Sequence, residues 1–308
     1  MKADQNTLPT VVAILGPTAS GKTALAIELA KEYDLEVINC DSRQIYREME
    51  IGTAKPSYEE RKAVVHHLID IVSPGEPFSA GDFVRLATSA INDIHSRGKL
   101  PLIVGGTGFY YDALVNGLPE TASNEEIRTE LQNRLEEDGI EKLLIELQTL
   151  DPVAAGRIDS SNPRRVLRAL EVIKMSGKSF SEALSNTEKL NADVIPILVN
   201  VPRELLLERI TKRIYTMLDL GLENEARTVY NKYGCSADAL KIIGYREWWD
   251  YFEGHRSFDE SVELINIHTR QYAKRQVTWF KKRPGGTFYD PREPGKIMEQ
   301  LKAKERKE

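Results

Sequence analysis

Residues Val11–Thr23 have the sequence VVAILGPTASGKT, from which the architecture of the chain can be predicted. It begins with apolar residues typical of a buried strand and continues into a G-x-x-x-x-G-K-T pattern that closes with Gly21, Lys22 and Thr23. In such a loop the backbone N–H groups turn inward around a phosphate, the lysine adds a positive charge and the threonine hydroxyl can coordinate Mg²⁺. A helical run follows directly, so its positive N-terminal end would face the same phosphate. The pattern therefore predicts a phosphate-binding loop over Gly16–Thr23.

The bulk composition excludes several classes of protein. The chain has 308 residues, 41% of them hydrophobic and 29% charged, with a net charge of −5, which is enough for one large domain or two smaller ones. No apolar run approaches the ~18 residues of a membrane span, and the first ten residues lack the apolar core of a signal peptide. Two cysteines, Cys40 and Cys235, make no disulfide framework, so we expect a cytoplasmic protein with no membrane association. The acidic net charge argues against a binder that is basic throughout, but it leaves a local basic surface open.

Further strand-like runs follow the first one at intervals filled by helical patterns. They are Leu35–Asp41, Leu100–Val104, Val194–Val201 and a last short one at Thr287–Tyr289. Strands separated by helices at these spacings imply right-handed crossovers and a parallel, doubly wound sheet, so we predict an α/β fold of the P-loop NTPase-like kind. Ligands of such sheets bind at the carboxyl ends of the strands. The Gly16 loop, Asp41 and the Gly105–Gly108 turn should therefore line one cleft.

A change of composition near Pro119 indicates a second domain. No strand-like run appears between it and Val194, and the helical patterns in that interval are Glu125–Glu137, Lys142–Thr149 and Arg164–Met175. We predict an all-helical insertion domain over residues 120–193, within a core domain made of 1–119 and 194–308. The carboxyl-terminal part of the core should be helical over Arg203–Leu220, Glu223–Tyr233, Gly244–Phe252 and about Phe258 to Lys282.

Asp41 is the first candidate for chemistry. It ends the strand after the phosphate-loop helix and should face the cleft beside Lys22. In most phosphate-loop NTPases the Mg²⁺-binding acid ends a later strand, whereas the later strand here ends in Gly105 and Gly106. An acid on the second strand is better placed to receive a substrate. The alternative is a structural loop acid.

Two basic features add to the cleft. Arg209 and Arg213 lie four residues apart and so share one helical face, from which they could neutralise a leaving phosphate group. The terminal helix has no acidic residue between Glu263 and Asp290. It carries instead basic residues and aromatic residues, namely Arg270, Lys274, Arg275, Lys281, Lys282 and Arg283 with Tyr272, Trp279 and Phe280. Positive charges on such a helix can bind the phosphates of a nucleic acid, and the aromatic rings beside them can stack on its bases. For the arginine pair and for this helix, the alternative is a helix face that is simply exposed to solvent.

Three classes of function are compatible with a phosphate-binding loop. Taken alone, the loop pattern indicates ATP or another nucleotide, as in an ATP-dependent small-molecule kinase. A transferase that acts on a nucleic acid is favoured, because a small-molecule kinase has no use for a long acid-free basic helix. A nucleotide-driven switch is disfavoured, because the acid on the later strand is missing.

Six blocks of the sequence carry a family resemblance. They are GPTASGKT (Gly16–Thr23), DSRQIYREMEIGTAKP (Asp41–Pro56), GGTGFYYDAL (Gly105–Leu114), NPRRVLRALEV (Asn162–Val172), IGYREWWDY (Ile243–Tyr251) and TRQYAKRQVTWFKK (Thr269–Lys282). In this order they are similar to the bacterial tRNA dimethylallyltransferases, also called tRNA isopentenyltransferases. The resemblance extends over nearly the whole chain. It implies transfer of a dimethylallyl group from its diphosphate to the exocyclic amine of the adenosine 3′ of the anticodon.

The resemblance also implies roles for single residues. The diphosphate would be held by Gly16, Pro17, Thr18, Ala19, Ser20, Gly21, Lys22 and Thr23, and Thr23 would contribute to a Mg²⁺ site. Asp41 would accept the proton of the amine, and Lys22 and Arg213 would stabilise the departing diphosphate. The implied tRNA-binding residues are Asp41, Ser42, Arg43, Gln44, Thr107, Arg128, Arg164, Arg165, Val166, Leu167, Arg168, Lys241, Gly244, Tyr245, Arg246, Lys274, Arg275, Gln276, Thr278, Trp279 and Lys281. The helical insertion would contact the anticodon stem-loop, and we expect a monomer.

Overall fold

A computed structural model describes residues 8–119, 124–160, 162–185, 187–282 and 287–305. Its contacts divide the chain into two units, one made of Met1–Asp112 and Asn191–Glu308, the other of Ala113–Leu190. The bounds of the second unit differ from the predicted 120–193. The difference at its start has a local cause, because the hydroxyl of Thr187 donates a hydrogen bond to the carbonyl of Asn116 at 3.1 Å and so ties the entry and exit segments together.

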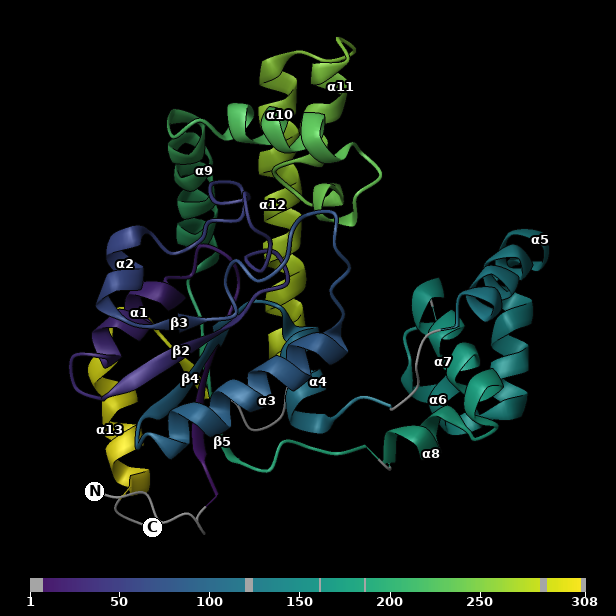
Figure 1. Ribbon diagram of the computed structural model, residues 1–308, viewed down its shortest axis with the longest axis horizontal. Coiled ribbons are helices and arrows are strands. Elements are labelled where there is room, and N and C mark those ends of the chain that lie inside the picture. The colour runs from purple at the N-terminus through teal and green to yellow at the C-terminus, as the bar shows by residue number, and fades with distance from the viewer. Residues whose placement is uncertain (1–7, 120–123, 161, 186, 283–286, 306–308) are drawn as a thin grey trace. The chain divides into compact units, whose positions relative to one another are not determined.

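The core unit is built on one six-stranded sheet (Figure 1). Its strands are β1 (Thr10–Leu15), β2 (Leu35–Cys40), β3 (His66–His67), β4 (Leu100–Gly105), β5 (Asp193–Val199) and β6 (Thr287–Tyr289). They are ordered β3-β2-β4-β1-β5-β6 and every neighbouring pair is parallel. The predicted parallel α/β sheet is confirmed, including its short last strand.

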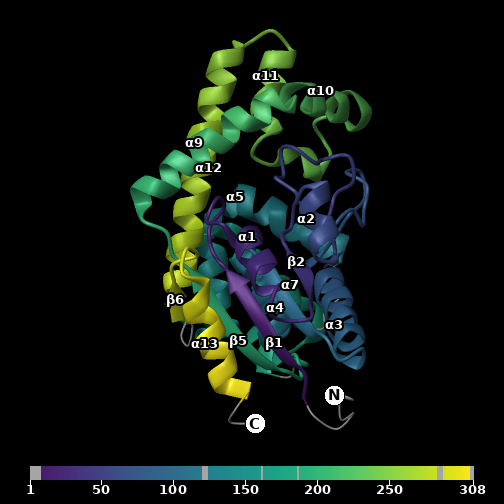
Figure 2. The same cartoon turned by 90° about the vertical axis from the view of Figure 1, so that its left-hand side faces the viewer.

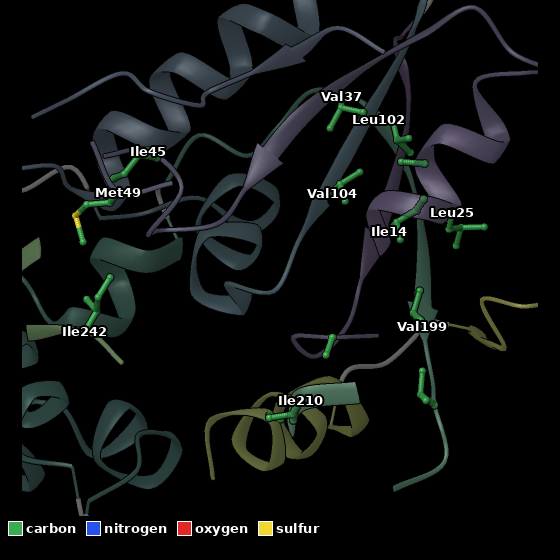
Figure 3. Close-up of a cluster of buried hydrophobic side chains, with 14 of the residues drawn as sticks. Ile14, Leu25, Val37, Ile45, Met49, Leu102, Val104, Val199, Ile210 and Ile242 are labelled. Atoms are coloured by element: carbon green, nitrogen blue, oxygen red, sulfur yellow. The ribbon is translucent and has the colours of Figure 1, made fainter. Parts of the chain in front are cut away.

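Side chains alternate between the two faces of the sheet, and both faces are covered. In β1, Val12 and Ile14 pack with Leu25 and Leu29 of helix α1 (Lys22–Leu29) in one continuous cluster. Figure 3 shows part of that cluster, with Ile14 and Leu25 beside Val104 of β4. The other face of β2 and β4 is contacted by α3 (Ala80–Ser96). A strand buried on both faces reads as a continuous apolar run, which explains why these strands were recognisable in the sequence.

The remaining helices of the core unit follow the strands or extend beyond the sheet. They are α2 (Tyr58–Ala63), α9 (Arg203–Asp219), α10 (Leu222–Tyr233), α11 (Trp249–Phe252), α12 (Phe258–Lys281) and α13 (Pro294–Glu305), while α4 (Gly108–Asn116) leads from β4 into the second unit. Helix α12 begins at a capping box, in which the hydroxyl of Ser257 accepts a hydrogen bond from the backbone N–H of Glu260 and the carboxylate of Glu260 accepts one from the backbone N–H of Ser257. Figure 2 shows α12 running alongside α9 toward the sheet.

The predicted helix over Gly244–Phe252 is wrong in its first half. Gly244 has a left-handed φ of 95°, and its N–H donates to the carboxylate of Glu247 at 2.8 Å. A short 3₁₀ turn, Arg246–Trp248, comes before α11. The side chain of Glu247 thus satisfies the backbone locally and replaces the first turn of a regular helix.

The second unit is helical throughout its described residues. Its helices are α5 (Glu125–Leu150), α6 (Pro152–Arg157), α7 (Pro163–Ser176) and α8 (Phe180–Ser185). Gly139 interrupts α5 with a non-helical backbone (φ 76°, ψ 168°), which accounts for two separate helical patterns in the sequence. Leu131, Leu143 and Leu147 of α5 pack against Val166 and Leu170 of α7 in a core of their own. Among the residues that the structure places, no helix combines the length and apolarity needed to cross a membrane.

Candidate active site at the carboxyl ends of the strands

The carboxyl ends of β1, β4 and β2 bring three segments together. Gly105 of β4 pairs with Leu15 on one side and with Cys40 on the other, so the segments starting at Gly16 and Asp41 leave the sheet on either side of the Gly105–Gly106 turn. They line a cavity of about 840 Å³. The expectation that they share one cleft is confirmed. The site residues lining it are Thr18, Ala19, Ser20, Gly21, Lys22, Thr23, Asp41, Arg43, Gln44, Arg213, Lys241, Gly244, Arg246, Arg275 and Gln276.

The glycines of β4 explain why no acid ends this strand. A Cβ atom at Gly105 would lie 2.0 Å from the carbonyl oxygen of Cys40. One at Gly106 would lie 2.3 Å from Nε2 of Gln276. Neither position has room for a carboxylate side chain. Asp41 instead brings a carboxylate into the cavity from the end of the neighbouring strand β2.

The phosphate loop connects β1 to α1 in a tight backbone path. Ala19 and Gly21 have left-handed φ values of 60° and 92°, and Nζ of Lys22 donates to the carbonyl of Pro17 at 2.8 Å. Burial and, second, the charge of Arg213 lower the pKa of Lys22 to about 8. A cationic group with a lowered pKa is one that an incoming anion would stabilise in its charged form.

Arg213 of α9 reaches the phosphate loop as predicted. Its Nη1 donates to the hydroxyl oxygen of Thr18 at 3.4 Å, and burial lowers the pKa of its guanidinium. Arg209, one turn earlier, lies beside Gly21, with Nη1 3.8 Å from the point where a Cβ of that glycine would sit. Both arginines thus approach the loop from one helical face.

Asp41 stands on the other side of the β4 glycines. Its Oδ1 accepts a hydrogen bond from the backbone N–H of Arg43 at 2.9 Å. The next residue, Ser42, donates its N–H to the hydroxyl of Thr107 at 3.0 Å, which ties the Asp41 segment to the β4 turn. Burial and, second, the charge of Asp41 raise the pKa of the Tyr272 hydroxyl, so a phenol from α12 lies within the electrostatic reach of this carboxylate. Sequence reasoning noted Tyr272 as an aromatic of the basic stripe and missed its place beside Asp41.

Glu225 of α10 holds the loop that follows Asp41. Its carboxylate accepts hydrogen bonds from the backbone N–H groups of Glu50, Ile51 and Gly52, at 2.9 to 3.1 Å. It also accepts one from the hydroxyl of Tyr245 at 2.7 Å. No pattern in the sequence could have indicated this residue, because its backbone partners lie 173 to 175 positions away along the chain.

The oxygen donors near the phosphate loop fit a magnesium ion. Among the described residues there is no cluster of three His, Cys, Asp or Glu side chains that could hold a metal by themselves. Mg²⁺ typically keeps several waters and binds one or two protein oxygens together with substrate phosphates. The hydroxyl of Thr23 and the carboxylate of Asp41, which both line the cavity, are hard oxygen donors of that kind.

Comparison with known proteins settles the family. The family model described as "IPP transferase" matches residues 44–283, and a second one, "Isopentenyl transferase", matches residues 9–72. The first covers more than half of the chain. This chain belongs to the IPP transferase family.

Individual relatives of the family agree with that assignment. The chain is 44% identical to a tRNA dimethylallyltransferase of Pediococcus pentosaceus, over 94% of this chain and 95% of the relative. It is 41% identical to one of Halalkalibacterium halodurans, over 91% and 90%. These matches give the kinase alternative no support.

Solved structures of the family confirm the fold. The full-length tRNA isopentenylpyrophosphate transferase of Bacillus halodurans matches with a TM-score of 0.72 and 38% identity, over 97% of each chain. A eukaryotic dimethylallyltransferase acting on tRNA matches with a TM-score of 0.75 and 31% identity, over 88% of this chain and 69% of that one.

The core-unit residues that the family resemblance assigns to tRNA fall into three groups by exposure. The exposed group comprises Arg43, Lys241, Arg246, Lys274, Arg275, Thr278 and Lys281, and the half-buried group comprises Asp41, Ser42, Gln44, Thr107 and Trp279. Gly244, Tyr245 and Gln276 are buried. Arg283, which the sequence adds to the basic stripe, lies outside the described residues.

Tyr245 cannot serve as an exposed tRNA-contacting ring. It is 1% exposed, its hydroxyl is bonded to Glu225, and a Cβ at Gly52 would lie 2.5 Å from its ring. Gln44 is also engaged, because its amide group donates to the carbonyl oxygens of Thr53 and Ala54 at 3.2 and 2.9 Å. Both side chains therefore shape the loop over Asp41–Pro56.

The predicted tRNA-binding residues of the second unit differ in their exposure to solvent. Arg164 and Arg165 are exposed, whereas Val166 is fully buried in the core of the unit and its prediction as a contact residue is wrong for the side chain. Successive residues of a helix point about 100° apart, so a run of consecutive site residues cannot share one surface. Arg128 and Arg168 both donate to the buried carboxylate of Glu171, at 3.1 and 2.8 Å. Leu167 is half-buried beside this core.

Proposed function

We propose that this chain transfers a dimethylallyl group from dimethylallyl diphosphate to the exocyclic amine of the adenosine 3′ of the anticodon in tRNA, with release of diphosphate. One observation carries the proposal. A phosphate-binding loop and the carboxylate of Asp41 line the same cavity on either side of the glycines at the end of β4, and no acid on β4 lies between them. The family membership of the chain supports the same reaction.

The diphosphate is assigned to the loop over Gly16–Thr23. Backbone N–H groups of such a loop and the N-terminus of α1 favour an anion. Lys22 and Arg213 lie at the same loop and supply positive charge where the leaving group gains negative charge. Because Arg213 is largely removed from water, its charge is screened less than that of a surface arginine.

Asp41 is assigned as the proton acceptor. In the transfer the amine nitrogen of the adenine forms a bond to the first carbon of the dimethylallyl group, and the bond from that carbon to the diphosphate oxygen breaks. The diphosphate keeps the electron pair, and the proton of the amine passes to the carboxylate of Asp41. The Arg43 N–H and the Ser42–Thr107 hydrogen bond hold the Asp41 segment for this role.

Mg²⁺ is assigned as the cofactor. Thr23 would hold it together with oxygens of the diphosphate, and Asp41 lines the same cavity. When bound, a magnesium ion supplies charge neutralisation to the diphosphate. Lys22 and Arg213 act on the same charge from the protein side.

The tRNA is assigned to basic residues of both units. In the core unit these are the exposed Arg43, Lys241, Arg246, Lys274, Arg275 and Lys281, and in the helical unit the exposed Arg128, Arg164 and Arg165 with the half-buried Arg168. Ser42, Gln44 and Thr107 would flank the target base, and the helical unit would contact the anticodon stem-loop. We further propose that the protein acts as a monomer in the cytoplasm.

One assay tests the proposed reaction against the kinase alternative. Unmodified tRNA transcript is incubated with the protein, Mg²⁺ and either dimethylallyl diphosphate or ATP, and its nucleosides are analysed by mass spectrometry. The expected result is the mass of one dimethylallyl group on the adenosine next to the anticodon, with the diphosphate donor only. A transcript with guanosine at that position is the control. Phosphate transfer from ATP, or no gain with either donor, would overturn the proposal.

A further inference from the structure

The side chain of Gln276 joins three parts of the active site. It projects from α12 and is 6% exposed. Its Oε1 accepts a hydrogen bond from the backbone N–H of Thr18 in the phosphate loop at 2.8 Å. Its Nε2 donates one to the carbonyl oxygen of Gly106 after β4, also at 2.8 Å. One amide thus connects the basic helix, the phosphate loop and the turn that separates the loop from Asp41.

The two backbone partners of Gln276 permit only one orientation of its side-chain amide group. A backbone N–H can only donate and a backbone carbonyl can only accept, so the side chain must offer an acceptor to Thr18 and a donor to Gly106. An ionised carboxylate has no donor, and an apolar side chain has neither. The surroundings are equally restrictive, because the position of a Cβ on Gly106 would lie 2.3 Å from Nε2 of Gln276 and 3.2 Å from the carbonyl oxygen of Gly16.

Thr18 connects Gln276 to Arg213 through two hydrogen bonds. The backbone N–H of Thr18 bonds Gln276, and its hydroxyl accepts the hydrogen bond from Nη1 of Arg213. A shift of Thr18 would therefore move both the loop and the arginine that faces it. Lys274 and Arg275, the two residues before Gln276, are exposed on the same helix.

We propose that Gln276 is a positioning residue for the donor substrate: it holds Thr18, and through Thr18 the guanidinium of Arg213, in the arrangement that binds a diphosphate. This role differs from the direct tRNA contact that the family resemblance assigns to Gln276. The inference rests on the proposed function for the identity of the donor. It predicts that a change at Gln276 weakens the binding of diphosphate compounds and leaves the binding of tRNA nearly unchanged.

The decisive variant is Gln276→Glu, which keeps the shape of the side chain and replaces the donor group by an oxygen. Near pH 8 its ionised carboxylate leaves the Gly106 carbonyl unpaired, so we expect the KM for dimethylallyl diphosphate and the inhibition constant of inorganic diphosphate to rise about tenfold or more. A protonated carboxyl group offers one donor and one acceptor, as the amide does. The defect relative to the unsubstituted protein should therefore shrink as the pH is lowered toward about 5.5.

Two further variants separate the local effect from general ones. Gln271→Glu introduces the same substitution on the exposed side of the same helix, and it should leave the KM for the donor unchanged at every pH. Gln276→Met fills a similar volume without either polar group, so its donor defect should persist at low pH. If Gln276→Glu does not fold, the donor KM of Gln276→Met still tests the positioning role of Gln276.

The outcomes are distinct from those that test the reaction itself. Donor KM and diphosphate inhibition within about twofold of the unsubstituted protein, or a defect confined to the KM for tRNA, would overturn the inference. If the unsubstituted protein transferred no dimethylallyl group, the proposed function would fail. Calorimetric titration with inorganic diphosphate would then still compare each Gln276 variant with the unsubstituted protein, and affinities equal to that of the unsubstituted protein would overturn the positioning role.

Discussion

The carboxylate of Glu225 lies 2.9 Å from the backbone nitrogen of Gly52, and it caps three consecutive N–H groups of the loop that follows Asp41. The same carboxylate accepts the hydrogen bond of Tyr245. Helix α10 and the buried Tyr245 therefore hold the loop that shapes the wall of the active-site cavity. Among the described residues, the hydrogen-bond partners of Glu225 have no direct part in the proposed reaction, so its effect on catalysis would be exerted through the loop.

Replacement of Glu225 by Gln should loosen this loop. One amide oxygen cannot accept all the hydrogen bonds that the carboxylate accepts, and its NH₂ group would face backbone donors, so we expect a loss of about 1–3 kcal/mol in the free energy of unfolding. Amide hydrogen exchange at residues 50–52 should accelerate. Glu223→Gln on the same helix is the control, because Glu223 pairs with Arg227 one turn away at the surface and contributes about 0.3–0.5 kcal/mol. Unchanged exchange at residues 50–52 would contradict the assigned role of Glu225.

Replacement of Asp41 by Asn should remove the proton acceptor and little else. Asn keeps an oxygen for the N–H of Arg43, so the loop geometry is retained. We expect turnover to fall about 10²–10⁴-fold, with the affinity for tRNA nearly unchanged. Asp41→Ala should show a similar loss of turnover. Near-normal turnover of either variant, measured in a single-turnover assay, would exclude Asp41 as the base.

The pH dependence of donor capture should follow Lys22. Its pKa is lowered to about 8, so Lys22 is charged below that pH and loses its proton as the pH rises through it. The kcat/KM for dimethylallyl diphosphate is therefore expected to fall above about pH 8, because the uncharged amine attracts the diphosphate less. Lys22→Met should have a low kcat/KM that does not fall further as the pH rises above about 8. A profile that stays flat to about pH 10 would assign Lys22 an ordinary pKa.

The basic face of α12 should contribute to tRNA binding through its charge. Lys274, Arg275 and Lys281 are exposed, and their joint replacement by Ala should reduce the slope of log K against log salt by about two to three. Joint replacement of Lys31, Lys296 and Lys302, which are exposed elsewhere on the core unit, is the matched control. If the two triple variants had the same salt slope, α12 would not be an RNA surface.

Two neighbours on α7 should respond in opposite ways. Val166→Ala removes buried methyl groups from the core of the helical unit and should cost about 2 kcal/mol of stability, without changing the salt dependence of tRNA binding. Arg165→Ala should leave thermal stability unchanged and weaken tRNA binding, since Arg165 is exposed. Thermal melts and filter-binding titrations on the same preparations compare the two. If Val166→Ala instead weakened tRNA binding without a loss of stability, Val166 would belong to the tRNA-binding surface.

Local sequence patterns were sufficient for the elements around the phosphate loop. Strands buried on both faces show as continuous apolar runs, and the loop shows as a fixed spacing of glycines with Lys22. The order of strands and helices then implied a parallel sheet, and the sheet placed Asp41 and Lys22 in one cleft. Local periodicity failed at Gly244, where the side chain of Glu247 bonds the backbone in place of a helical turn.

The fold class, the phosphate loop and the family with its candidate residues could thus be predicted from sequence patterns. Which of those residues are available to a substrate, and which hold the site together, depends on how distant segments pack in three dimensions. Gln276 and Thr18 are 258 positions apart, and Glu225 meets the loop at Gly52 across 173. Such pairs leave no periodic or compositional signal, because a hydrogen bond depends on where two distant segments meet in space. For the same reason the burial of Val166 and Tyr245 follows from packing and not from the motifs in which they stand.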